Sequence, residues 1–192
     1  MPEQIKVFNF SGNKIKEISN SNEQTFFINT YYDKLLHENY IITANVDFVK
    51  SYDYRNNKVY KKYEDKNHNL YKNQHISLLI DCYDEKLIKL IESSNDGYIR
   101  IWDFHSALLL SKIKISGQGL NSLCLIKENY LFVACEDKTL KLIEINEGKV
   151  LRSFKAHNKE VITIKKIFHP KFGESLISQG YGDSPIIVWI NK

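Results

Sequence analysis

A short pattern recurs along this chain at intervals of about 40 to 50 residues. Four aspartates, each followed by an apolar stretch, are separated by 49, 41 and 46 residues: Asp47, Asp96, Asp137 and Asp183. A repeat of about 40 to 45 residues is the length of a unit of four antiparallel strands, and such units bury their apolar faces by stacking. The spacing therefore predicts an all-β array of four-stranded units.

The segments between these aspartates have the composition of strands. Runs such as 25–31, 98–104 and 161–167 are rich in β-branched and aromatic residues, and a helical period over ten or more residues is hard to find. Turn residues such as Asn95-Asp96-Gly97 separate many of the runs, as tight hairpins require. Counting the runs predicts two strands, then three groups of four, then a group of three.

The best copy of the pattern runs from Asp96 to Asp103 and reads Asp-Gly-Tyr-Ile-Arg-Ile-Trp-Asp. In this copy and in the last one a tryptophan, Trp102 or Trp189, follows the aspartate by six positions. The stretch 148–157 adds a strand that leads into Ala156-His157, where Gly-His is usual. These features resemble the WD-repeat family over almost the whole chain. The resemblance implies a WD40-type β-propeller with about four four-stranded antiparallel blades.

In that family a histidine, a hairpin aspartate and a tryptophan form a hydrogen-bonded network inside one blade, because a buried indole N–H and a hairpin carboxylate both need partners. The resemblance implies that this structural network is made here by His75, Asp96, Trp102, His157, Asp183 and Trp189. The choice between His68 and His75 stays open. The repeat between the two good copies keeps Asp137 but has Ile143 in place of Trp and no histidine in 116–122, and the first repeat has Tyr52-Asp53 in place of Trp-Asp.

No linker composition divides the chain, so a single propeller domain or propeller fragment is expected over 1–192. Its blades are expected at about 24–64, 75–115 and 118–155, with partial blades at 1–19 and 157–191. Propellers of this family commonly close with seven blades, so either the chain is the C-terminal part of a larger propeller or it closes as a small ring. We favour the incomplete propeller, because four blades of this size would splay in a ring. Open blade edges would then be a surface for self-association.

Composition limits the partners and the compartment. The formal net charge is +4. The 27 basic residues are 24 lysines and three arginines, and they are interleaved with 23 acidic residues. The composition therefore argues against nucleic-acid binding, since base and phosphate recognition rely on the planar fork of arginine. Three cysteines without a C-x-x-C pair indicate reduced thiols and a cytoplasmic protein. No secretory signal or transmembrane segment is predicted.

Catalytic, cofactor and metal motifs are not found in the sequence. Cys82, Cys124 and Cys135 lie in or beside apolar strands, the histidines are scattered without ligand spacing, and the Gly-x-Gly stretches at 117–119 and 180–182 precede no helix. We therefore expect no enzymatic activity, no cofactor and no metal.

Function is assigned instead to a surface. In the resembled fold, the hairpins after each second strand share one rim with the loops before each first strand. The candidate partner-binding rim is Phe48, Tyr98, Lys138, Tyr181 and Ser184. The leading hypothesis is a protein interaction scaffold that holds a peptide or a partner domain in a larger assembly. The alternative is a propeller that binds a polyanion, RNA or an acidic membrane, through its lysines.

Overall fold

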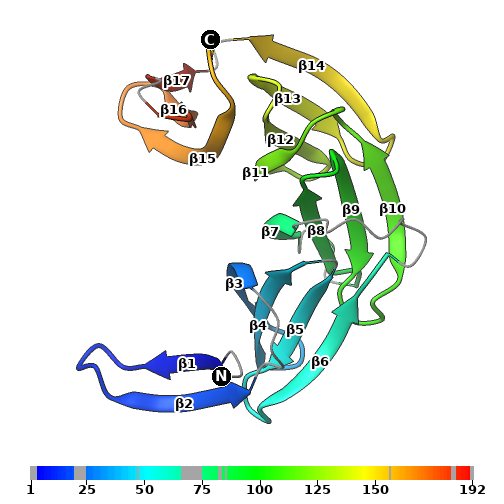
Figure 1. Cartoon of the computed structure of the whole chain (residues 1–192), viewed down its shortest axis with the longest axis vertical. Coiled ribbons are helices and arrows are strands. Elements are labelled where there is room, and N and C mark those ends of the chain that lie inside the picture. The colour runs from blue at the N-terminus through cyan, green and yellow to red at the C-terminus, as the bar shows by residue number, and fades with distance from the viewer. Residues whose placement is uncertain are drawn as a thin grey trace. The chain divides into compact units, whose positions relative to one another are not determined.

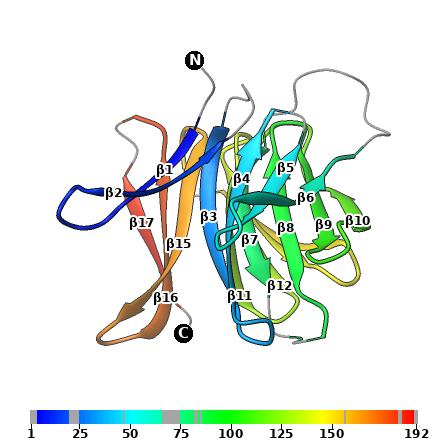
Figure 2. The same cartoon turned by 90° about the horizontal axis from the view of Figure 1, so that it is seen from below.

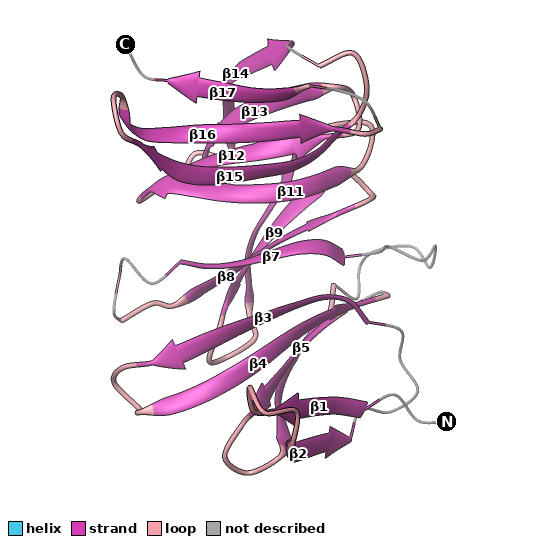
Figure 3. Ribbon diagram, turned by 90° about the vertical axis from the view of Figure 1, so that its left-hand side faces the viewer, coloured by secondary structure: helices cyan, strands magenta, loops and turns pink. Residues whose placement is uncertain are grey.

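The described part of the chain folds entirely into strands and their connections. The computed structural model describes residues 4–19, 25–46, 48–65, 75–81, 84, 86–155, 157–182 and 185–190, and within these ranges it contains 17 strands and no helix (Figure 3). The strands form five antiparallel sheets of two, four, four, four and three strands. The all-β class predicted from the sequence is confirmed, and the number of strands in each group agrees with the count made there.

The chain divides into two compact units, Met1–His75 and Ile76–Lys192, each with its own buried core. The first unit contains a two-stranded and a four-stranded sheet (Figure 1). Their strands are β1 (Gln4–Phe8), β2 (Lys14–Ser19), β3 (Thr25–Asp33), β4 (Glu38–Asn45), β5 (Val49–Asp53) and β6 (Lys58–Tyr63). The expectation of a single domain over 1–192 stays a prediction.

The two sheets of the first unit are held together by an apolar cluster. Alternation along β1 and β2 directs Ile5, Val7 and Ile18 to one face, and this face packs against Ile41, Tyr52 and Tyr54. The ammonium group of Lys16 donates a hydrogen bond to the carbonyl oxygen of Tyr54 beside this cluster. The first two strands therefore form a layer on the four-stranded sheet.

The second unit contains two four-stranded sheets and one three-stranded sheet (Figure 2). The first, with His75 at its start, consists of β7 (His75–Asp81), β8 (Lys89–Ser94), β9 (Tyr98–Asp103) and β10 (Leu109–Lys114). The second consists of β11 (Leu120–Lys127), β12 (Tyr130–Cys135), β13 (Thr139–Glu144) and β14 (Lys149–Lys155). The third consists of β15 (Val161–His169), β16 (Gly173–Gly180) and β17 (Ile186–Ile190). In every sheet, strands that are consecutive in the sequence are neighbours.

The core of the second unit lies between these successive sheets. Apolar residues of β8 to β10 pack against β11 to β13, and the opposite face of the β11–β14 sheet packs against β15 and β16. At the first of these contacts Ile113 of the fourth strand is buried, and a Cβ atom on Gly148 would lie 3.5 Å from its Cγ1. A fourth strand thus helps to fill the space between two sheets.

Candidate partner-binding site

The hairpin between β8 and β9 carries a buried ion pair. Asp96 accepts hydrogen bonds from the hydroxyl of Ser94 and from the backbone N–H of Tyr98, and its Oδ2 lies 2.6 Å from Nη2 of Arg100. The side chain of Arg100 is 1% exposed, and Glu92 Oε1 lies 3.8 Å from its Nη1. Burial raises the pKa of the Asp96 carboxyl, but the hydrogen bonds from Arg100 and Ser94 outweigh it, so that the pKa lies below its ordinary value. This carboxylate fixes the turn and is already occupied by protein groups.

The next hairpin repeats this arrangement with different residues. Asp137 pairs with the ammonium group of Lys141 four residues later and accepts hydrogen bonds from Thr139 and from Ser116 Oγ, the latter at 3.1 Å. Burial raises the pKa of Asp137 here too, and the bonds from Lys141 and Thr139 again bring the pKa below its ordinary value. The hairpin aspartate and a base four positions on are therefore a repeated structural device.

The last sheet uses neutral groups instead. The hydroxyl of Ser178 on β16 lies 2.8 Å from Nε2 of His157 and accepts a hydrogen bond from the indole N–H of Trp189, also at 2.8 Å. His157 is buried, and burial lowers the pKa of its imidazole. The structure therefore brings His157 and Trp189, two of the predicted network residues, together on one hydroxyl.

The other predicted network residues are placed only in part. Trp102 is buried on β9, and Asp96 has the partners described above. His68 and Asp183 lie outside the described residues, as does the side chain of His75. Sequence analysis missed Arg100, Lys141 and Ser178. The signal for the first two was a base four residues after Asp96 and after Asp137; Ser178 is one of two serines on β16, and no sequence signal distinguishes it.

The described rim residues lie in or next to hairpin turns, at different positions relative to the hairpin aspartate. Tyr98 begins β9, Lys138 lies in the β12–β13 turn, and Tyr181 follows β16 with 63% of its surface exposed. Phe48 immediately precedes β5 in the first unit, and Ser184 lies outside the described residues. The aromatic rings at two of these positions carry ammonium groups over their faces. Lys112 and Lys114 lie 4.8 and 4.3 Å from the ring centre of Tyr98, and Lys50 and Lys62 lie 4.9 and 4.3 Å from that of Phe48.

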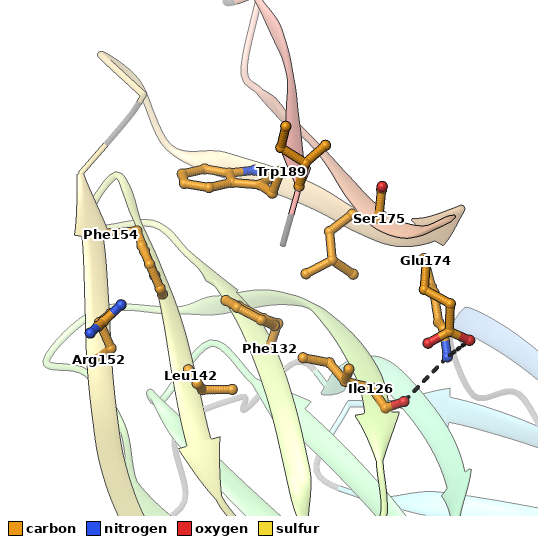
Figure 4. Close-up of a pocket in the computed structure, with 11 residues that line it drawn as sticks. Ile126, Phe132, Leu142, Arg152, Phe154, Glu174, Ser175 and Trp189 are labelled. Atoms are coloured by element: carbon orange, nitrogen blue, oxygen red, sulfur yellow. Dashed lines mark hydrogen bonds and ion pairs between the residues drawn. The ribbon is translucent and has the colours of Figure 1, made fainter. Parts of the chain in front are cut away.

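A groove that sequence analysis did not predict lies between the second and third sheets of the second unit (Figure 4). It has a volume of about 460 Å³, and aromatic side chains from three strands contribute to its walls: Phe132, Phe154 and Trp189. Arg152 on β14 and Leu176 on β16 also line it. We call it the β17 groove.

Groups suited to chemistry are sparse in the described part of the chain. No cluster of three or more His, Cys, Asp or Glu side chains that could hold a metal occurs among those residues. Cys124 and Cys135 are buried free thiols, and burial raises the pKa of Cys135 to about 12, while Cys82 lies outside the described residues. None of the described segments is a helix long and apolar enough to cross a membrane.

Comparison with known proteins gives one informative sequence match. No family model matches the chain. A WD repeat domain-containing protein 83 homolog from Dictyostelium discoideum is 32% identical over 105 residues, and the match covers 53% of this chain and 30% of the relative. The chain thus matches less than a third of the length of that protein.

Solved structures with low identity resemble the fold. The computationally designed Ika8 protein has a TM-score of 0.68 at 15% identity, with 95% of this chain and 50% of that one covered. The designed Ika4 protein has a TM-score of 0.59 at 17% identity, with 80% and 86% covered. At such identities the likeness concerns the fold alone. Together, the comparisons support a WD-repeat relationship for part of an all-β chain of antiparallel sheets.

Proposed function

We propose that this chain is part of a WD40-type propeller and acts as a non-enzymatic scaffold that binds other proteins in the cytoplasm. The single observation that carries the proposal is the repetition of one unit, a four-stranded antiparallel meander whose hairpin aspartate pairs with a base four residues later. The partial sequence match to a WD-repeat protein supports the same reading. Repeated rigid units of this kind present extended surfaces, and such surfaces serve binding.

The proposed contact surface is the rim formed by Phe48, Tyr98, Lys138, Tyr181 and Ser184. Aromatic side chains are common anchors in protein interfaces. At Tyr98 and Phe48 the neighbouring lysines add positive charge, so a partner with carboxylates around an apolar residue would be complementary. The rim would therefore favour acidic peptides or acidic faces of partner domains.

The proposal is tested by removing the rim aromatics from the intact chain. A Phe48→Ala/Tyr98→Ala/Tyr181→Ala variant and the unmodified protein would be affinity-purified from cells, and the copurified proteins quantified by mass spectrometry. We expect at least one copurified protein to fall by about tenfold or more, the size of effect expected from losing a central aromatic anchor.

A matched control removes three exposed aromatics outside the rim. Phe8, Phe26 and Phe168 are 53%, 38% and 76% exposed and lie on strands β1, β3 and β15. Their replacement by alanine should leave the copurified proteins unchanged. If both triple variants retained every partner equally, the proposed rim would be wrong.

The lysines over Tyr98 and Phe48 also favour a second candidate, binding of a polyanion. Titration with a single-stranded RNA oligonucleotide at two salt concentrations separates the two readings, because phosphate contacts weaken steeply with ionic strength. Tight, strongly salt-dependent RNA binding would favour the polyanion function over the scaffold.

A further inference from the structure

Two hairpin turns of the second unit lie at the same end of that unit. Nδ2 of Asn121 on β11 donates a hydrogen bond to the carbonyl oxygen of Val161 on β15, and Nζ of Lys166 donates one to that of Ile126. These two contacts align β11 and β15 in the same direction. The β11–β12 and β15–β16 turns therefore lie together, at the opposite end of the strands from the β12–β13 turn with Lys138.

The β15–β16 turn exposes two aromatic rings. Phe168 is 76% exposed and Phe172 is 39% exposed. Consecutive residues of a strand point to opposite faces, so Phe168 and His169 lie on opposite faces of the hairpin. The ring of Phe172 packs against that of His169, with ring centres 4.7 Å apart. The tip of this hairpin therefore carries aromatic rings on both of its faces.

Both turns also place a lysine against an aromatic ring. Nζ of Lys171 lies 5.5 Å from the ring centre of Phe172, and Nζ of Lys127 lies 4.9 Å from that of Tyr130. Both lysines are exposed, and among the described residues no carboxylate forms an ion pair with either of them. Each turn thus presents a free ammonium group next to a ring.

This combination fits the surface of an acidic membrane. Aromatic rings favour the boundary between headgroups and acyl chains, and a lysine beside a ring can extend its ammonium group to acidic headgroups. A flat apolar phase covers rings on both faces of a tip at once, whereas a pocket shaped for one face leaves the other ring in water. The stretch 165–174 contains three lysines and one glutamate, so its charge is complementary to acidic lipids.

We propose that this end of the second unit binds the surface of a membrane that contains acidic phospholipids. Phe168 and Phe172 insert at the acyl boundary, and Lys127 and Lys171 lie among the headgroups. Two rings and two lysines make a weak, reversible anchor, because binding grows with the apolar area buried and with the attraction to anionic lipids. The β12–β13 turn at the other end stays free for a protein partner. This inference goes beyond the proposed scaffold function.

The test uses the whole chain and lipid vesicles of defined composition. Phosphatidylcholine vesicles with about 30% phosphatidylserine supply the acidic surface, and vesicles of phosphatidylcholine alone are the comparison. Cosedimentation measures the partition of the chain into each. We expect partition into the acidic vesicles to be about tenfold stronger, the effect of two lysines near an anionic surface. Equal partition, or none into either kind of vesicle, would overturn the proposal.

Removal of the two rings tests insertion. Phe168→Ala/Phe172→Ala should lower partition into the acidic vesicles by about tenfold or more, because the apolar area that enters the boundary is lost. The matched control Phe8→Ala/Phe26→Ala removes two exposed rings of the first unit and should change partition by less than about twofold. Thermal unfolding checks that both variants are folded. Equal losses in the two variants would show that the tip is not the binding surface.

Removal of the two lysines tests the contact with headgroups. Lys127→Gln/Lys171→Gln should weaken partition into the acidic vesicles about tenfold. The control Lys138→Gln/Lys155→Gln removes the same charge from exposed lysines at the other end of the strands and should have an effect of less than about threefold. If both pairs weakened binding equally, only the total charge would matter and the proposal would be wrong.

A fluorescent reporter keeps the proposal testable without loss of a ring. With Phe168→Trp, brominated acyl chains in the acidic vesicles should quench fluorescence more than in the unmodified chain, which has only Trp102 and Trp189. Equal quenching would mean adsorption by charge alone and would overturn insertion. Binding of polyglutamate without binding of the vesicles would identify an acidic protein as the partner of these turns instead. The turns contact lipid and no rim partner, so either failure leaves the scaffold function standing.

Discussion

The two hairpins β8–β9 and β12–β13 have the same construction but very different burial. In the first, the arginine and aspartate side chains are 1% and 8% exposed, and both guanidinium nitrogens approach the carboxylate. In the second, the lysine and aspartate side chains are 12% and 27% exposed. A buried charge that loses its partner is costly, whereas a partly solvated one is rescued by water. The same sequence pattern can therefore carry very different energetic weight.

The residue that follows the hairpin aspartate, Gly97 after Asp96 and Lys138 after Asp137, also differs in packing between the two hairpins. Gly97 and Lys138 both have positive φ angles, of 78° and 69°. The carbonyl oxygen of Gly97 accepts hydrogen bonds from Ile115 and Ser116, and a Cβ on Gly97 would overlap Ser116 O and lie 2.7 Å from Gln118 O. The lysine at the corresponding position of the second hairpin has an exposed side chain. At Gly97 the first hairpin packs tightly against the next connection, whereas the side chain of Lys138 in the second hairpin is exposed to solvent.

The largest expected effect comes from Arg100→Met. It leaves Asp96 and the nearby carboxylate of Glu92 buried without the guanidinium, so the free energy of unfolding should fall by about 3 to 5 kcal/mol. Lys141→Met in the second hairpin is the matched substitution and should cost about 1 kcal/mol. Urea denaturation of both variants measures the difference. Equal losses would break the comparison, because burial would then not determine the cost.

Gly97→Ala should have the next largest effect. The added Cβ meets backbone oxygens that cannot move aside, and the positive φ angle is unfavourable for alanine, so we expect a loss of about 3 kcal/mol. Lys138→Gly relieves the same φ angle without any overlap and should stabilise the chain by about 0.5 kcal/mol. Thermal unfolding of the pair checks both signs. A tolerated Gly97→Ala would mean that the first hairpin is not held against the connection after β10.

The strands were predictable because their signals are local. Turn residues such as Asn95-Asp96-Gly97 and apolar runs such as 98–104 depend only on neighbours in sequence, and the strand β9 begins at Tyr98 as expected. The repeat spacing also predicted that consecutive strands form groups of four. The repeat spacing could not predict how deeply equivalent positions of different repeats are buried, because burial depends on the packing of neighbouring sheets.

The site was less predictable for the same reason. Arg100 has no special place in the sequence pattern, yet it is the buried partner of Asp96, because the turn after Asp96 brings the two side chains together. The β17 groove is formed by residues from two sheets, with Phe132 and Trp189 separated by more than 50 positions. No local pattern marks such a cavity. The shared hydroxyl of Ser178 was missed because a single serine on a strand has many possible partners.

Ser178→Ala extends the comparison to the third sheet, where the hydrogen bonds join uncharged side chains. Removal of the hydroxyl leaves Nε2 of His157 and the indole N–H of Trp189 without the bonds that they make now, so we expect a loss of about 2 kcal/mol. Ser175→Ala on the same strand removes a hydroxyl that bonds the backbone oxygen of Gly173 and should cost less, about 1 kcal/mol. Urea denaturation checks the order. A smaller loss at Ser178 than at Ser175 would show that the shared hydroxyl does not stabilise the sheet.

The smallest expected effect is a pH dependence that separates the third sheet from the two ion-paired hairpins. Burial lowers the pKa of His157, so the unfolded chain takes up a proton near pH 6.5 while the folded chain does not. The free energy of unfolding should therefore decrease as the pH falls below about 7 and level off below the folded pKa. The carboxylates of Asp96 and Asp137 have lowered pKa values in the folded chain, so their stabilisation is present above about pH 4 and is lost only in more acidic solution. In His157→Gln, the free energy of unfolding measured by urea denaturation should change less between pH 7.5 and pH 5 than in the unmodified chain. An unchanged pH dependence in His157→Gln would assign it to another group.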